Sequence, residues 1–199
     1  MAKAKSTFVL SGEVRNLNHL EIHVEFTNNY FEIFGIPETF SPDLAALSDR
    51  YRELQKEFHP DRFAGKAERD RLLAVQWAAT INQAFDTLKS PLKRAQYLLS
   101  LKDVDSSGEK TVSNDPVFLM EQMELREALA EVREQSDPFA ALDGLRDRAQ
   151  GDYRQQQDDF SQQFQQENYS DAEATVAKMQ FLVKFLAEVE LLEEQLDDE

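Results

Sequence analysis

The sequence predicts an all-α protein, in which a helical hairpin is followed by an antiparallel three-helix bundle. Apolar residues recur at spacings of three and four along most of the chain after residue 30, which is the period of an amphipathic helix. The 199 residues include only six glycines and six prolines, so long helices with few turns are favoured. Four of the prolines directly follow Ser or Asp, a pairing that is typical of a helix start.

The hairpin is expected within residues 30–104. After a short helix over 30–35, a longer one starts at Ser41-Pro42, with the proline at its first helical position. That helix must end before Pro60, because proline lacks a backbone N–H and forces the preceding residue out of helical geometry. A second helix follows the turn, and a shorter third one starts at Ser90-Pro91. The facing apolar stripes are Leu44, Leu47, Tyr51, Leu54 and Phe58, and then Leu73, Trp77, Ile81, Ala84, Phe85 and Leu88.

The bundle is expected after residues 105–113, a polar segment without periodicity that we interpret as a linker. Its helices should span about 116–134, 138–166 and 171–196, with Ser170 and Glu173 forming a capping box for the last one. Short connections make consecutive helices antiparallel. The middle helix carries its core stripe at Leu142, Leu145, Ala149, Tyr153, Phe160 and Phe164.

Residues 1–29 form an extension with one noticeable pattern. His19, Glu21, His23 and Glu25 alternate with apolar residues, which is the period of a strand and would place four polar groups on one face. Two histidines and two carboxylates on one face are a potential metal site. An ordinary edge strand or a disordered extension is the simpler interpretation, and we predict no metal site and no cofactor.

Composition excludes several classes of protein. The absence of cysteine excludes disulfides, thiolate metal sites and a catalytic cysteine. The apolar runs are too short to cross a membrane or to direct secretion, so we expect a cytoplasmic protein. Residues 105–199 contain eight basic and twenty-four acidic side chains, a difference that equals the whole net charge of −16. Because phosphate binding needs a basic patch, we expect no nucleic-acid partner.

The turn His59-Pro60-Asp61, called the HPD turn below, is the first candidate site. It carries an imidazole, a rigid ring and a carboxylate side by side, which suits a hydrogen-bonded contact with another protein. The alternative is an ordinary polar loop. Arg52 and Lys56 share a helix flank nearby and Arg62 follows the turn. These cations are either solvated surface or a means of steering an acidic partner.

The second candidate lies on the helix predicted over 116–134. At 100° per residue, Phe118, Leu125, Leu129 and Val132 cluster within about 60° and form its core stripe. Leaving a large apolar side chain in water forgoes about 1.5–3 kcal/mol, so the three apolar residues on the opposite side indicate a partner, and the acids among them indicate a basic one. The alternative is that the hairpin covers them. This acidic-apolar patch consists of Leu119, Met120, Met123, Glu124, Glu127 and Glu131.

These motifs resemble known families. His-Pro-Asp between two antiparallel amphipathic helices resembles the signature of the J-domain. The stretch from Phe118 to Glu127 downstream of it resembles the HscB family of iron–sulfur co-chaperones, as do 79–84 and 94–101. The resemblance runs from about residue 30 to the C-terminus. Arg62 departs from the lysine often found at that position, and the extension 1–29 has no counterpart.

The resemblance implies a J-domain at 30–104 and a scaffold-binding domain at 114–199. The HPD turn, with Arg52, Lys56 and Arg62, would contact an HscA/DnaK-type chaperone ATPase and stimulate its ATP hydrolysis. The acidic-apolar patch, joined by Phe181 from the last helix, would bind an IscU-type scaffold protein. The implied function is that of a non-enzymatic co-chaperone that delivers the scaffold to the ATPase during iron–sulfur cluster maturation.

Three alternatives are open. The first is a general J-domain co-chaperone with a different client, which should tolerate loss of Glu124 and Glu127. The second is an enzyme, but His59 and Asp61 lie on an exposed turn without a second base or a water-excluded site. The third is a purely structural helical protein, which leaves Met120 and Met123 unexplained.

Overall fold

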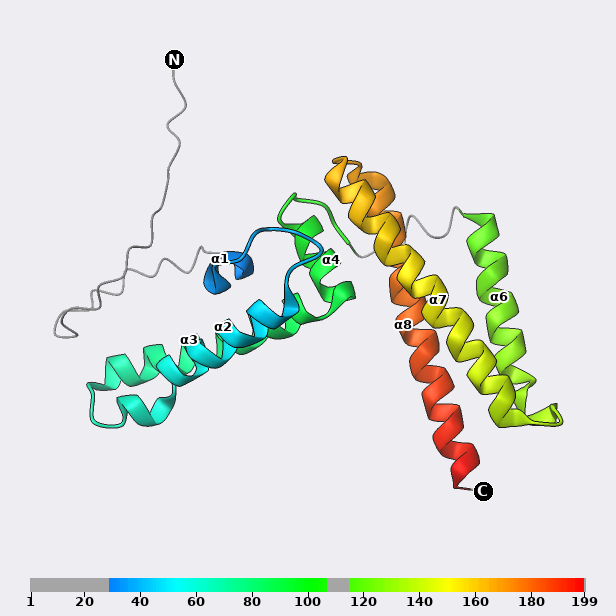
Figure 1. The fold of residues 1–199 in the computed structure, drawn as a ribbon, viewed down its shortest axis with the longest axis horizontal. Helices are drawn as coiled ribbons and strands as arrows, with labels where there is room; N and C mark the ends of the chain where they lie inside the picture. Colours follow the sequence, from blue (N-terminus) through cyan, green and yellow to red (C-terminus); the bar gives the residue numbers. More distant parts are fainter. Residues whose placement is uncertain (1–28, 107–114, 199) are drawn as a thin grey trace, which may run out of the picture.

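The computed structural model describes residues 29–106 and 115–198, and these residues form helices but no strand. The hairpin of α2 (Leu44–Glu57) and α3 (Glu68–Lys89) lies at one end of the long axis, and α6 (Pro116–Ala130) lies at the other (Figure 1). Between them lie α4 (Pro91–Ser100), α7 (Pro138–Gln165) and α8 (Tyr169–Asp197), whereas α1 (Tyr30–Phe34) lies beside the hairpin. The predicted all-α fold, with a hairpin and a three-helix bundle, is confirmed. The alternating segment 19–25 and most of the predicted linker lie outside the described residues.

The two predicted stripes of the hairpin meet in one core. Leu47 and Leu54 of α2 are buried together with Trp77 and Ile81 of α3. The Tyr51 ring stacks on Phe85 at a centroid distance of 4.0 Å, and its hydroxyl donates to Asn82 Oδ1 at 2.9 Å. The Phe58 ring lies 5.6 Å from Trp77 at the far end of α2. Aromatic contacts therefore fix α2 against α3 up to the HPD turn.

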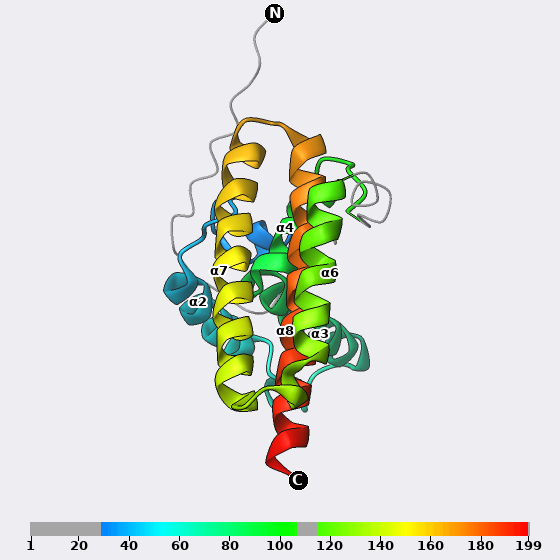
Figure 2. The same ribbon diagram turned by 90° about the vertical axis from the view of Figure 1, so that its right-hand side faces the viewer.

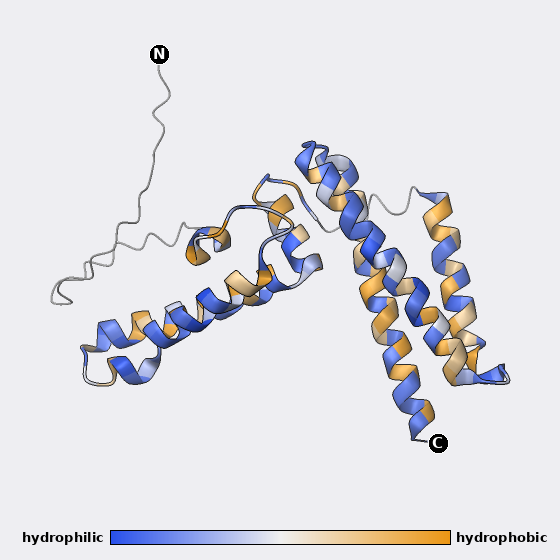
Figure 3. Cartoon of the chain, viewed as in Figure 1, coloured by the Kyte–Doolittle hydropathy of each residue, from blue (hydrophilic) through white to orange (hydrophobic). Residues whose placement is uncertain are grey.

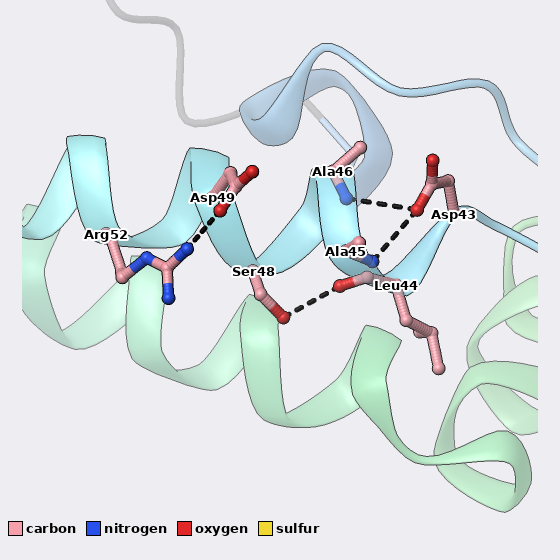
Figure 4. Close-up of polar contacts among 7 residues, drawn as sticks. All are labelled: Asp43, Leu44, Ala45, Ala46, Ser48, Asp49 and Arg52. Carbon is pink, nitrogen blue, oxygen red and sulfur yellow. Dashed lines mark hydrogen bonds and ion pairs between the residues drawn. The ribbon is translucent and has the colours of Figure 1, made fainter.

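Three of the four predicted proline starts are confirmed. Pro91, Pro116 and Pro138 each occupy the first helical position, after Ser90, Asp115 and Asp137 whose side chains accept a backbone hydrogen bond. Pro42 does not, because α2 begins only at Leu44. Asp43 caps that helix, its Oδ1 accepting from the amides of Ala45 and Ala46 at 2.9 and 3.0 Å (Figure 4). A carboxylate at the N-terminus also interacts favourably with the helix dipole. The N-cap is therefore Asp43 and not the Ser41 that we predicted.

The predicted capping box at Ser170 and Glu173 is wrong. Helix α8 begins at Tyr169, after Asn168, whose side chain accepts no capping hydrogen bond. Glu167 has a left-handed φ of 58°, and the Asn168 amide donates to the Gln163 carbonyl at 2.9 Å. This is the closing bond of a Schellman motif. The connection is therefore so tight that α8 starts before the serine.

Helices α7 and α8 form a long antiparallel pair, and α6 packs along one half of it. Figure 2 shows α6 beside both helices and running in the same direction as α8. Lys178 Nζ lies 2.8 Å from Asp115 Oδ2 and links the start of α6 to α8. This lysine, more than the Phe118 amide, lowers the pKa of Asp115. The buried residues of this core are Phe118, Leu125, Val132, Leu142, Ala149, Phe181, Leu182, Phe185 and Val189.

The other half of the α7–α8 pair packs against the hairpin module, residues 30–104. Phe160 of α7 and Ala172, Val176 and Met179 of α8 belong to the hairpin's core. We predicted Phe160 and Phe164 in the bundle core, and that assignment is wrong. Helix α6 has 15 residues, whereas α7 has 28 and α8 has 29. The part of the pair beyond α6 is therefore covered by α4 and by the loop that carries Phe40.

Arg94 on α4 fills the centre of this contact. Its guanidinium lies 4.9 Å from the centroid of the Phe40 ring, and that ring lies 4.7 Å from Phe160. Arg94 Nη1 donates to the Leu88 carbonyl at 2.6 Å, while no described residue accepts from its Nε. Burial lowers the pKa of Arg94. A buried guanidinium that retains these partners is expensive to expose or to replace, so it holds the Phe40 ring where that ring meets Phe160 of the other module.

Because the modules share a core, loss of one ring between them should destabilise the whole chain. We expect Phe160→Ala to lower the free energy of unfolding by about 3–5 kcal/mol, the usual cost of deleting a buried aromatic ring. Phe139→Ala, on the exposed start of α7, is the matched control and should cost less than about 1 kcal/mol. Urea unfolding followed by circular dichroism measures both. Equal effects of the two changes would contradict a shared core.

Candidate functional site

The HPD turn lies at the free tip of the hairpin (Figure 1). His59 has extended backbone angles and precedes the short 3-10 helix η1 (Pro60–Phe63). Its Nδ1 accepts from the Asp61 amide at 3.3 Å and lies 3.6 Å from Asp61 Oδ2. Nδ1 is thus engaged within the turn, which leaves Nε2 for a contact with another molecule. The turn offers a ring nitrogen and a carboxylate to a partner.

The cations beside this turn differ in how they are engaged. Arg52 forms an ion pair with Asp49 within α2 (Figure 4). Arg62 Nη1 donates to the Lys56 carbonyl at 3.3 Å, close to the end of α2, whereas Lys56 forms no ion pair with any described residue. An exposed ion pair contributes only about 0–1 kcal/mol. All three predicted cations are therefore available to a partner at little cost.

The acidic-apolar patch lies on α6, at the opposite end of the molecule from the HPD turn (Figure 1). Met120 and Met123 are 63% and 61% exposed, and Leu119 is partly exposed beside them. Glu124 and Glu127 on the same helix are exposed, and so is Glu131, the residue that caps its C-terminus. Figure 3 shows hydrophobic residues along α6 alternating with hydrophilic ones. The hairpin does not cover these side chains, so this alternative is excluded and the apolar surface is open.

Phe181 does not share this exposed surface. Only 8% of it is exposed, because its ring packs edge-to-face on Phe118 at a centroid distance of 5.6 Å. The Arg126 guanidinium lies 5.4 Å from the centre of the same ring. Phe181 therefore packs against the buried face of α6. A partner that touches this ring would first have to displace the arginine.

Two features of the patch were not predicted. Val117 is 66% exposed and lies one turn before Met120, a spacing visible in the sequence. Arg148 of α7 lies 3.6 Å from Glu124, and this contact depends on how α6 and α7 pack. Glu127 and Glu131, in contrast, form no ion pair with any described residue. The negative charge of the patch is therefore concentrated in its second half.

Comparisons with known proteins connect both surfaces to one family. A DnaJ domain model matches residues 29–97, and a model described as the HscB C-terminal oligomerisation domain matches residues 114–190. A co-chaperone protein HscB homolog of Vibrio vulnificus is 48% identical over 168 residues, which are 84% of this chain and 98% of the relative. The chain belongs to the HscB family of co-chaperones.

Solved structures of the HscB family have the same fold. Chaperone HscB from Vibrio cholerae matches with a TM-score of 0.77 and 47% identity, over 85% of this chain and 99% of that one. Human co-chaperone protein HscB matches with the same TM-score and 27% identity, over 85% of this chain and 84% of the human chain. The family resemblance seen in the sequence is thereby confirmed.

The described residues offer little to support other site chemistry. Among them there is no group of three or more His, Asp or Glu side chains that could hold a metal ion. No helix in 29–106 or 115–198 is both long and apolar enough to span a bilayer. The potential ligands His19, Glu21, His23 and Glu25 lie outside the described residues. The HPD turn and the acidic-apolar patch therefore remain the two candidate sites.

Proposed function

We propose that this co-chaperone binds an IscU-type scaffold through the acidic-apolar patch and delivers it to an HscA/DnaK-type chaperone ATPase. The HPD turn then stimulates ATP hydrolysis during iron–sulfur cluster maturation. The exposure of Met120 and Met123 is the observation that carries this proposal, since two large apolar side chains on an acidic face need a partner. Membership of the HscB family supports it.

The chain acts in this proposal without chemistry of its own, in the cytoplasm. Its contribution is to hold the scaffold close to the ATPase, so that two modest contacts act together. The shared core supports this role, because it joins the module that carries the HPD turn to the one that carries the patch. The two surfaces lie at opposite ends of the molecule, so both partners have room to bind at once.

The charges of the two surfaces favour different partners. The HPD turn is flanked by Arg52, Lys56 and Arg62, which suit an acidic surface on the ATPase. Within residues 29–106 and 115–198, Glu127 and Glu131 of the patch have no ion-pair partner, so the patch suits a basic surface on the scaffold. This opposite polarity reduces binding of each partner at the wrong end.

The HPD turn should be needed for stimulation but not for scaffold binding. We expect His59→Gln to reduce stimulation of the ATPase by at least about tenfold, the effect of losing roughly 1.4 kcal/mol of coupling, because the amide does not reproduce the geometry of the imidazole's ring nitrogen. Steady-state ATP hydrolysis by an HscA-type ATPase measures this. Asp86→Asn, on the exposed surface of α3, is the control and should stimulate normally. Full stimulation of the ATPase by the His59→Gln variant would contradict the role that we assign to the HPD turn.

The patch should account for most of the scaffold affinity. We expect Met120→Ala/Met123→Ala to weaken binding of an IscU-type scaffold by about 30-fold or more, since each truncation removes roughly 1–2 kcal/mol of apolar burial. Isothermal titration calorimetry measures the dissociation constant. Leu72→Ala/Val75→Ala is the matched control, because these side chains are 59% and 55% exposed on α3 of the other module. Equal affinity of both double variants would refute the assignment.

The general co-chaperone and the scaffold adaptor should differ in how much their client binding depends on the carboxylates of the patch. A holder of unfolded chains needs apolar surface but no particular carboxylate, so Glu124→Gln/Glu127→Gln should leave its binding intact. A scaffold adaptor should lose affinity, and the loss should shrink at high salt because exposed charges are screened. The same titration, repeated at two ionic strengths, distinguishes the two functions.

A further inference from the structure

Helix α7 lies beside the acidic-apolar patch, and one of its arginines contacts a carboxylate of the patch. Arg148 Nη2 lies 3.6 Å from Glu124 Oε2, and the two side chains are 48% and 60% exposed. Direct hydrogen bonds between a guanidinium and a carboxylate are shorter, at about 2.7–2.9 Å. Because an exposed ion pair contributes little to stability, Glu124 can exchange Arg148 for another cation at little cost.

A second arginine of α7 is held much more firmly. Arg146 donates hydrogen bonds to Asp143 of its own helix and to Glu193 of α8, and only 26% of its side chain is exposed. It therefore joins two helices of the bundle. For Arg148, the contact with Glu124 is the single ion pair within residues 29–106 and 115–198. This contrast indicates that Arg148 acts on the patch and not on the packing of α7.

The face of α7 around Arg148 is open. Gly144 and Gly151 lie four residues before it and three residues after it, so the three residues share one face of the helix. A Cβ atom added at either glycine would meet no side chain and no neighbouring helix within 4 Å. The guanidinium can therefore move away from Glu124, and a client side chain can reach this carboxylate across α7.

The apolar surface of the patch leads to the same carboxylate. Val117 is 66% exposed, and Val117, Met120, Glu124 and Glu127 follow one another at spacings of three, four and three along α6. They therefore form one line on the helix surface. A client that covers Val117 and Met120 comes within reach of Glu124, where Arg148 already lies.

Resting on the proposed function, we propose that Arg148 is a specificity-determining residue of the client site: it occupies Glu124 in the free protein and is displaced by a lysine or arginine side chain of the client. The client cation then forms the ion pair with Glu124, while the displaced guanidinium is hydrated on the open face of α7. A client without this cation gains nothing from Glu124, because Arg148 already neutralises it. The client segment therefore carries a basic side chain next to apolar ones.

This competition makes two carboxylates of the patch unequal. Glu127 has no ion-pair partner among the described residues, so its whole attraction is available to the client. The contribution of Glu124 is reduced by the cost of releasing Arg148. Removal of Arg148 should therefore tighten client binding, although it deletes an ion pair from the protein.

The test is isothermal titration calorimetry of the full chain with an IscU-type scaffold protein. We expect Arg148→Gln to lower the dissociation constant about threefold, which is within the range of an exposed ion pair. The gain should disappear in the Glu124→Gln background, because no carboxylate is left to release. It should also shrink at high salt, since exposed charges are screened.

Two further variants are controls. Arg154→Gln removes the same charge from the exposed surface of α7, but at 100° per residue it lies about 120° around the helix from Arg148. It should change the affinity less than about 1.5-fold, because a distant exposed charge is screened. Arg148→Lys keeps the charge and should keep most of the native affinity. Thermal unfolding verifies that each variant is folded.

The outcomes separate this inference from the proposed function. Unchanged or weaker binding by Arg148→Gln would overturn the inference, as would an equal gain in the Glu124→Gln background or from Arg154→Gln, which would indicate a general charge effect. Loss of affinity in Met120→Ala/Met123→Ala would leave the proposed function standing in each of these cases. If the native chain does not bind the scaffold, the proposed function and the inference fail together.

Discussion

Helix α4 and the loop that carries Phe40 pack against the C-terminal half of α7 and the N-terminal half of α8. This packing fixes the position of one module relative to the other. Arg94 stacks on Phe40, and Phe40 contacts Phe160, so a buried cation and two rings join modules that the sequence separates by a polar linker. Bundle residues Val176 and Met179 complete the same core. The linker therefore does not set the relative position of the modules. Side-chain packing sets it, through the contact of Phe40 with Phe160 and the residues buried around these rings.

This arrangement explains how one small chain can serve two partners. The HPD turn and the acidic-apolar patch lie at opposite ends of the molecule, and their flanking charges have opposite signs. Each surface is small, so neither contact needs to be tight. Under the proposed function, a fixed separation would let two modest contacts act together, because the first binding event would raise the local concentration for the second.

Most helices could be predicted from sequence because apolar spacing and proline starts are local signals. The exposed methionines were predicted for the same reason, since the core stripe through Phe118 and Leu125 leaves them on the opposite face. The position of Phe160 could not be predicted, because its stripe is continuous with that of the bundle. The bundle core ends before Phe160 because α6 is shorter than α7, and this difference in length is seen only in the structure.

The same limit applies to the candidate site. Phe181 was assigned to the patch by resemblance, yet the orientation of α8 buries it under Arg126. The pairing of Glu124 with Arg148 depends on the contact of α6 with α7. Sequence periodicity describes one helix at a time. It therefore predicts which face of a helix is buried but not which residues of two helices contact each other.

The central claim, that a shared core fixes the distance between the two surfaces, is tested most directly by pulsed electron–electron double resonance. The chain has no cysteine, so Ala64→Cys beside the HPD turn and Glu121→Cys on α6 introduce two unique spin-label sites, both exposed. The account predicts a single narrow distance distribution for the free protein in solution. A broad distribution, as for modules joined only by a flexible linker, would contradict it.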